Sequence, residues 1–168
     1  MDEIRTERLI LRPARAADLE DMHAVLSNGQ AMRFWSTVAH TDREQTREWL
    51  DRMIFDSPAE RVDFVIEFEG RAIGKAGCWR LPQIGFILHP DHWGRGYARE
   101  AVEAVIAAIF ERLPIPEITA DVDPRNRASL ALLQRLGFEK TATARRTWFV
   151  GGEWCDSIYL ALPRPGSS

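Results

Sequence analysis

The sequence predicts one domain of mixed α/β class, in which helices cover a mixed β-sheet. The chain has 168 residues, of which 45% are hydrophobic and 28% charged, a composition ordinary for a globular domain with a buried core. Some segments alternate apolar and polar residues with period two, and others repeat apolar residues at helical spacing. Their order is a strand, two helices, three strands, a helix, a strand, a helix and final strands, which favours a mixed sheet between helices.

The first part of the chain is predicted to form a strand and two helices. Residues 6–13 alternate in part and stop at a proline, which is typical of a strand. Residues 18–27 carry apolar side chains at helical spacing. Thr41 and Glu44 have the pattern of a capping box, so a second helix is expected to begin there.

Three strands are expected next. Residues 62–68 alternate with period two, and the Glu69-Gly70 pair makes a tight turn into residues 72–79, which together predict a hairpin. The third strand, residues 83–88, ends in an apolar run.

The rest of the chain is predicted to contain two helices and the remaining strands. A helix from Tyr97 to about Arg112 has an apolar stripe and is stopped by prolines. Further elements are expected at 117–122 (strand), 129–136 (helix), 138–143 and 147–150 (extended) and 154–162 (strand), with a disordered tail at 163–168 of the single domain 1–168.

Composition excludes several classes of protein. A net charge of −3 gives no support for binding nucleic acid or an anionic membrane surface. No apolar run approaches the roughly 20 residues that span a bilayer, and the N-terminus lacks the pattern of a signal peptide. Cys78 and Cys155 lie far apart in the sequence and predict reduced thiols in a cytoplasmic protein.

A glycine-spaced turn at residues 93–98 separates the third strand of this group from the helix that begins at Tyr97, and it contains no acidic side chain. Gly94 and Gly96 allow the main chain to approach a ligand closely and to point several N–H groups the same way. The helix N-terminus adds unpaired N–H groups and a positive dipole end. These features predict a site for a phosphate-bearing ligand.

The run Trp93-Gly94-Arg95-Gly96-Tyr97-Ala98 resembles the acyl-CoA pyrophosphate loop of the GCN5-related N-acetyltransferases (GNAT), whose pattern is Gln/Arg-x-x-Gly-x-Gly/Ala. Trp93 departs from the first position, but an aromatic residue there is typical of the subgroup that acetylates ribosomal-protein N-termini (RimJ/RimL-like). The resemblance covers roughly residues 6–162. It implies the acyl-CoA N-acyltransferase fold, with a mostly antiparallel sheet flanked by helices, and an acetyl-CoA-dependent N-acetyltransferase that needs no metal.

The resemblance also implies which residues bind the coenzyme. Main-chain groups of one strand would pair with pantetheine, the loop would hold the pyrophosphate, and an asparagine of a second motif would line the thiol end. Carried over to this sequence, these residues are Phe86, Ile87, Leu88, Gly94, Arg95, Gly96, Tyr97, Ala98, Arg99 and Asn126.

The second motif is Asn126-x-x-Ser129, in a segment that ends in Leu136-Gly137-Phe138 and looks like the Asn-x-x-Ser helix of this family. Many relatives protonate the leaving thiolate with a tyrosine, but Leu133 occupies that place here. In the ribosomal-protein subgroup a serine takes the role, so the resemblance implies that Ser129 is catalytic. Asn126 alone would also be an ordinary helix N-cap.

The general base and the acceptor stay open at this stage. The subgroup's glutamate falls at Thr147 or an adjacent residue, none of them acidic, and Gln83 stands where other relatives carry Glu. The remaining candidates are His89, His92, Glu67, Asp121, Glu153 and Asp156. The acceptor, a small-molecule amine or a peptide N-terminus, is expected near Phe34, Trp35 and Trp148, in a monomer or homodimer.

Other interpretations are less well supported. The loop lacks the third glycine of a dinucleotide fingerprint and the Lys-Ser/Thr of a P-loop. His89 and His92 sit on one turn with no second cluster at ligand spacing, which argues against a metal site. The six tryptophans of an acidic chain fit core packing better than a nucleic-acid platform. The alternative functions are an acyl-CoA-binding module without turnover and an interaction protein that binds no coenzyme.

Overall fold

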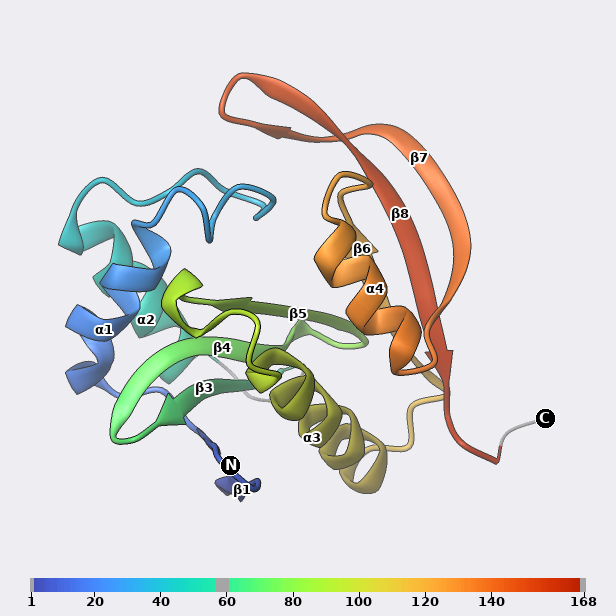
Figure 1. Ribbon diagram of the computed structural model, residues 1–168, viewed down its shortest axis with the longest axis horizontal. Helices are drawn as coiled ribbons and strands as arrows, with labels where there is room; N and C mark the ends of the chain where they lie inside the picture. Colours follow the sequence, from blue (N-terminus) through green and yellow to red (C-terminus); the bar gives the residue numbers. More distant parts are fainter. Residues whose placement is uncertain (1, 57–60, 167–168) are drawn as a thin grey trace.

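The computed structural model of the chain describes residues 2–56 and 61–166 (Figure 1). Eight strands form one sheet in the order β1-β2-β3-β4-β5-β6-β8-β7. Neighbouring strands run antiparallel, with the exception of the parallel pair β5 and β6. The expectation of a mixed, mostly antiparallel sheet flanked by helices is therefore confirmed.

Most elements lie within a residue or two of the positions that the sequence predicts. The strands are β1 (Ile4–Arg5), β2 (Ile10–Arg12), β3 (Val62–Phe68), β4 (Arg71–Arg80), β5 (Gln83–Leu88), β6 (Glu117–Val122), β7 (Glu139–Val150) and β8 (Glu153–Pro163). The helices are α1 (Leu19–Leu26), α2 (Arg43–Phe55), α3 (Tyr97–Arg112) and α4 (Arg127–Arg135), with short 3₁₀ helices at Ala16–Asp18 and Pro90–His92.

The two faces of the sheet carry separate hydrophobic clusters. Phe64 and Ile66 of β3 point to one face, where they pack in the larger cluster with the apolar stripe of α3. Val65, between them, points to the other face and packs with residues of α1 and α2. Because β3 is buried on both faces, its alternation separates two cores rather than a core from solvent.

Three predictions about element ends are wrong, two of them in the N-terminal part of the chain. Of the expected first strand at residues 6–13 only β2 (Ile10–Arg12) is a strand. It pairs antiparallel with β1 (Ile4–Arg5), because Thr6 accepts a hydrogen bond from the Leu9 N–H and turns the chain between them. The α2 cap is Asp42, whose carboxylate accepts from the N–H of Gln45, rather than Thr41.

The third wrong prediction is the start of the disordered tail, which was expected at residue 163, where the chain is still ordered. Pro163 pairs with Glu117 at the end of β8, and Arg164 donates hydrogen bonds to the carbonyls of Ile115, Phe110 and Leu113. These bonds fix the chain after β8 against the end of α3. Residues 167–168 lie outside the described residues. In the part of the chain that the structure describes, no helix has the length and apolar character needed to cross a membrane.

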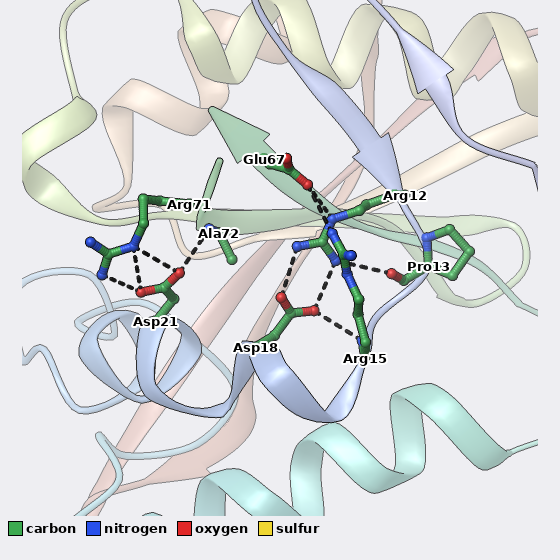
Figure 2. A network of polar contacts seen from close by, with 8 residues as sticks. All are labelled: Arg12, Pro13, Arg15, Asp18, Asp21, Glu67, Arg71 and Ala72. Carbon is green, nitrogen blue, oxygen red and sulfur yellow. Dashed lines mark hydrogen bonds and ion pairs between the residues drawn. The ribbon is translucent and has the colours of Figure 1, made fainter. Parts of the chain in front are cut away.

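Arginine–carboxylate bonds attach α1 to the sheet (Figure 2). The guanidinium of Arg12, on β2, donates to Asp18 just before α1 at 2.8 and 2.9 Å and to Glu67 of β3. Asp21 of α1 accepts from the side chain of Arg71 and, at 3.1 Å, from the N–H of Ala72. These contacts fix the start of α1 and, through it, the direction of the segment that connects α1 to α2.

The sheet opens between the parallel strands β5 and β6. Within the described residues the two strands pair at one position only, Gln83 with Thr119, near the start of both. The Thr119 N–H donates to the carbonyl of Pro82 at 2.9 Å. Beyond this pair no residue of β5 pairs with β6 among the described residues, so the rest of this edge of β5 has no strand partner. In the chain α3 follows β5 and α4 follows β6 (Figure 1).

Candidate active site

A cleft of about 860 Å³ lies at this opening, a size usual for a small-molecule site. Its walls come from β5, the loop before α3, the first turn of α3, one side of α4 from Arg127 to Arg135, and the connection between α1 and α2. Of the residues expected from the sequence, it brings together Phe34, Trp35, Phe86, Ile87, Leu88, Gly94, Gly96, Tyr97, Ala98, Arg99, Asn126 and Ser129.

The loop before α3 has the conformation that its glycines permit. Gly94 and Gly96 have φ of 74° and 82°, in the left-handed region, and Gly96 is the N-cap of α3. None of the described residues accepts a hydrogen bond from the N–H groups between Gly94 and Arg99. The indole of Trp93 donates to the carbonyl of Leu88 at 2.9 Å, which attaches the loop to the end of β5.

Residues of the N-terminal segment bind the loop and the first turn of α3 through side-chain hydrogen bonds. Glu100 accepts from the hydroxyl of Thr6 at 2.5 Å and from the main-chain N–H and Nε of Arg8 at 2.9 and 2.8 Å. The Arg8 guanidinium then lies 4.5 Å from the centre of the Tyr97 ring and donates to the carbonyl of Arg95 at 2.8 Å. Arg95 thus supports the loop through its carbonyl, and its side chain does not line the cleft.

We expect Glu100→Gln to lower the free energy of unfolding by about 1–2 kcal/mol near pH 7, because charge-assisted bonds to Thr6 and Arg8 are weakened. Burial raises the pKa of Glu100, but the hydrogen bonds from Thr6 and Arg8 outweigh it and leave the pKa below its ordinary value of 4.5. The stabilisation is therefore present above that value and is lost as pH falls through the lowered pKa.

Urea unfolding of both proteins at several pH values measures this effect. The difference between wild type and Glu100→Gln should shrink under acid conditions. Glu103→Gln, at an exposed position one turn further along α3, is the matched control and should change stability little. A difference that is independent of pH would contradict the role of the ionised carboxylate.

The start of α4 presents the second motif to the cleft. The side-chain oxygen of Asn126 accepts from the N–H of Ser129 at 3.2 Å, so Asn126 is the N-cap of α4 and keeps its amide N–H groups for a ligand. The Ser129 hydroxyl has no hydrogen-bond partner among the described residues. Leu133, in the place of the tyrosine of many relatives, is 1% exposed and belongs to the core.

Most candidates for the base are engaged elsewhere. Glu67 and Glu153 form ion pairs with arginines, and Asp121 and Asp156 accept from the Trp148 indole and the Arg146 N–H. Thr147 bonds to Ser157. Among the six open candidates, His92 lines the cleft, beside the loop, and burial together with the charge of Arg95 lowers its pKa.

Of the three residues expected to contact the acceptor, two line the cleft and one does not. Phe34 and Trp35 lie on the α1–α2 connection, and a Cβ on Gly85 of β5 would lie 3.9 Å from Cη2 of Trp35, in ordinary contact with the ring. Trp148 does not line the cleft, because its indole reaches across β8 and donates to Asp121 of β6 at 3.0 Å. The β7–β8 turn still approaches the acceptor side, where a Cβ on Gly151 would be 3.1 Å from Val38.

Most of the charged side chains in the cleft were not predicted from the sequence. Four lining arginines were not predicted: Arg33, Arg125, Arg127 and Arg135. Arg125 and Arg127 flank Asn126 in the second motif, so their spacing offered a signal. Arg33 offered none, because its position depends on how the α1–α2 connection folds over β5.

Comparison with known proteins agrees with this geometry. Residues 8–139 match the acetyltransferase (GNAT) domain family. A Bacillus subtilis (strain 168) protein described as "Probable N-acetyltransferase YjcK" is 38% identical, with 96% of this chain and 97% of the relative covered.

Two solved structures share the fold and were determined with coenzyme A. Spermidine N-acetyltransferase from Vibrio cholerae, in complex with CoA and spermine, is 21% identical with a TM-score of 0.82, covering 95% of this chain and 97% of that one. The ribosomal L7/L12 acetyltransferase RimL, in complex with CoA, is 18% identical with a TM-score of 0.86, covering 99% and 100%. The family match and the relatives confirm the N-acetyltransferase class expected from the sequence, and the chain belongs to the acetyltransferase (GNAT) domain family.

Proposed function

We propose that this enzyme moves the acetyl group of acetyl-CoA directly to a primary amine, with both substrates bound in the cleft between β5 and β6. One observation carries the proposal: the N–H groups from Gly94 to Arg99 are unpaired among the described residues, and every residue of this run except Arg95 lines that cleft. A diphosphate is the group that such an arrangement of amides and helix dipole binds best. Solved relatives that contain CoA support the choice of coenzyme.

The other contacts follow from this placement. The amides from Gly94 to Ala98 hold the pyrophosphate, and Arg99 stands in the first turn of α3 beside it. Pantetheine pairs with the open main-chain edge of Phe86, Ile87 and Leu88 as an added strand would. Asn126 donates its free amide N–H groups to the same arm of the coenzyme, and no metal takes part.

In the reaction, the amine nitrogen attacks the thioester carbonyl, the new C–N bond forms, and the C–S bond breaks. A main-chain N–H of β5 stabilises the oxyanion of the tetrahedral intermediate. The departing sulfur receives a proton from the Ser129 hydroxyl, which is replenished by the proton that the amine gives up. The arginines that line the cleft lower the pKa of an ammonium group beside them, so a larger share of the acceptor is neutral and able to attack. The positive charge of these arginines thus helps to deprotonate the amine, and no side chain is assigned as the general base.

Replacing Ser129 with alanine should lower kcat by about 10- to 100-fold at saturating amine, the lower part of the range for general acid catalysis. The effect is modest because a thiol with a pKa of ~8.5 is already a good leaving group. The measurement is thiol release under saturating acetyl-CoA. Stabilisation by CoA in thermal unfolding should be unchanged, since alanine keeps the N–H that residue 129 donates to the helix N-cap Asn126. A kcat within twofold of wild type would remove Ser129 from the mechanism.

The proposal as a whole is tested by thermal unfolding with CoA, together with thiol release in the presence of a panel of amines. Stabilisation together with amine-dependent thiol release supports it. Stabilisation without release would identify an acyl-CoA-binding module, the alternative to which the buried Leu133 lends support. Absence of stabilisation would refute coenzyme binding altogether.

The finer assignments concern the acceptor and the cell compartment. Relatives include enzymes named for spermidine and for a ribosomal protein, so a small amine and a peptide N-terminus both belong to the chemistry of the family. Cys78 and Cys155 are free thiols in the structure, which supports a reaction in the cytoplasm. We propose a monomer or homodimer that acts on such an amine, without nucleic acid or membrane as partner.

A further inference from the structure

The charged side chains that line the cleft are all positive. Its lining contains five arginines, Arg33, Arg99, Arg125, Arg127 and Arg135, and no aspartate or glutamate among the described residues. The chain as a whole is slightly acidic, with a net charge of −3, so the sign of the cleft is a local feature. An acceptor with several positive charges would be repelled from such walls.

The arginines stand on different walls. Arg99 is in the first turn of α3, and Arg127 and Arg135 belong to α4, so these three frame the path proposed for the coenzyme. Arg33 comes from the opposite wall, the α1–α2 connection that also carries Phe34 and Trp35. Its position is therefore on the acceptor side of the cleft.

Arg33 is exposed, contacts an aromatic ring and forms no ion pair within the described residues. Its guanidinium lies 4.8 Å from the centre of the Phe34 ring, a cation–π contact. Arg125 lies 5.5 Å from the same ring, but its N–H groups are occupied by Asp123 at 2.8 and 3.0 Å and by Glu153 at 2.6 Å. Hydrogen bonds that the Asp123 carboxylate accepts from Arg125 and, to a smaller extent, the charge of Arg33 lower the pKa of Asp123, but within the described residues this carboxylate forms no ion pair with Arg33.

We infer that the acceptor is an amine that also carries a carboxylate, and that Arg33 binds this carboxylate. The inference rests on the proposed function. An arginine fork matches a carboxylate in two parallel hydrogen bonds, and stacking on Phe34 restricts the guanidinium before the acceptor arrives. Arg33 thus determines specificity, and this chain differs from the structural relative that was solved with spermine.

Three primary amines with the same four-carbon chain test the inference: 4-aminobutyrate, n-butylamine and 1,4-diaminobutane. They differ in the group at the far end, which is an anion, a methyl group or a cation. Thiol release from saturating acetyl-CoA gives kcat/KM for each. We expect 4-aminobutyrate to exceed both other probes by at least about tenfold, which is about 1.4 kcal/mol of differential binding.

Variants then locate the contact. Arg33→Gln should raise KM for 4-aminobutyrate about tenfold and bring its kcat/KM close to that of n-butylamine. The kcat/KM of n-butylamine, which has no carboxylate to bind, should fall far less, and the KM for acetyl-CoA should not change. Arg33→Lys should recover part of the preference, because a lysine supplies charge without the fork. Arg47→Gln, an exposed arginine of α2, is the matched control and should keep the full preference.

Each other outcome overturns the inference. A wild-type enzyme that prefers 1,4-diaminobutane, or shows no preference, has no carboxylate site. A raised KM for acetyl-CoA in Arg33→Gln would place Arg33 on a coenzyme phosphate. If no amine releases thiol, the proposed function fails. The contact between Arg33 and a carboxylate is then tested separately, by calorimetric titration of the CoA-saturated protein with two amides. That protein should bind 4-acetamidobutyrate more tightly than N-butylacetamide, with the difference lost in Arg33→Gln; equal binding refutes the inference.

Discussion

The Gly96→Glu variant is expected to bind CoA at least about 100-fold more weakly than wild type while keeping its fold. Gly96 has φ of 82°, and a side chain there costs about 1–2 kcal/mol in the left-handed region. Its Cβ would lie 3.2 Å from Nη2 of Arg8, the residue that supports the loop. The new carboxylate would also stand at the amides that we assign to the pyrophosphate, where it repels the ligand.

Gly70→Glu separates these effects. Gly70 has φ of 79° in the β3–β4 turn, and no atom lies within 4 Å of the position that a Cβ would take, so the same substitution brings the same backbone strain and charge away from the cleft. Both variants should lose similar stability, measured by urea unfolding. Calorimetric titration with CoA should distinguish them, because Gly70→Glu should bind as wild type does. Equal binding by Gly96→Glu and wild type would refute the assignment of the loop.

Elements bounded by local signals could be predicted to the residue. Strand β5, the start of α3 at Tyr97 and strand β6 have the ends that the sequence indicates, because glycines and prolines stop the apolar runs there. The N-terminal strand was wrong for a physical reason. Thr6 turns the chain while bonded to Glu100, 94 residues away, and no local pattern contains that contact.

The same distinction applies to the site. The loop glycines, Asn126 and Ser129 lie in continuous motifs, and the structure places them at one cleft. Arg33 and Trp148 depend on tertiary packing. Arg33 reaches the cleft because the α1–α2 connection lies over Gly85, and Trp148 leaves it because Asp121 accepts its indole N–H. Sequence motifs thus predicted which residues of the loop and of α4 line the cleft far better than which residues of the α1–α2 connection and of β7 do.

Beneath the acceptor wall lies a buried ion pair that the sequence did not indicate. Lys75 of β4 donates to Asp63 of β3 at 2.9 Å, and their side chains are 5% and 1% exposed. Burial and the nearby Asp63 carboxylate raise the pKa of Cys78 to about 12, which keeps this thiol neutral. The Trp35 ring centre lies 5.8 Å from Nζ of Lys75, so the pair also supports the wall of the cleft.

Lys75→Met should lower the free energy of unfolding by about 3–5 kcal/mol, because it leaves a buried carboxylate without its counter-charge. Methionine keeps most of the side-chain volume, so the loss reports charge rather than a cavity. Water cannot easily replace the lysine, since the Gly77 main chain packs directly on Asp63. Urea unfolding measures the loss, and Arg43→Met, which removes an exposed pair with Glu20, is the control that should cost far less.

The double variant Asp63→Leu with Lys75→Met decides what the pair contributes. Two apolar side chains in place of two buried charges should restore stability to that of wild type or above it, because both desolvation costs disappear together. If the double variant stays as unstable as Lys75→Met, packing rather than charge explains the loss. If stability returns but kcat/KM for the amine is lower than that of wild type, the ion pair has its main role in holding Trp35 against Gly85, since a neutral pair offers that ring no cation to stack on.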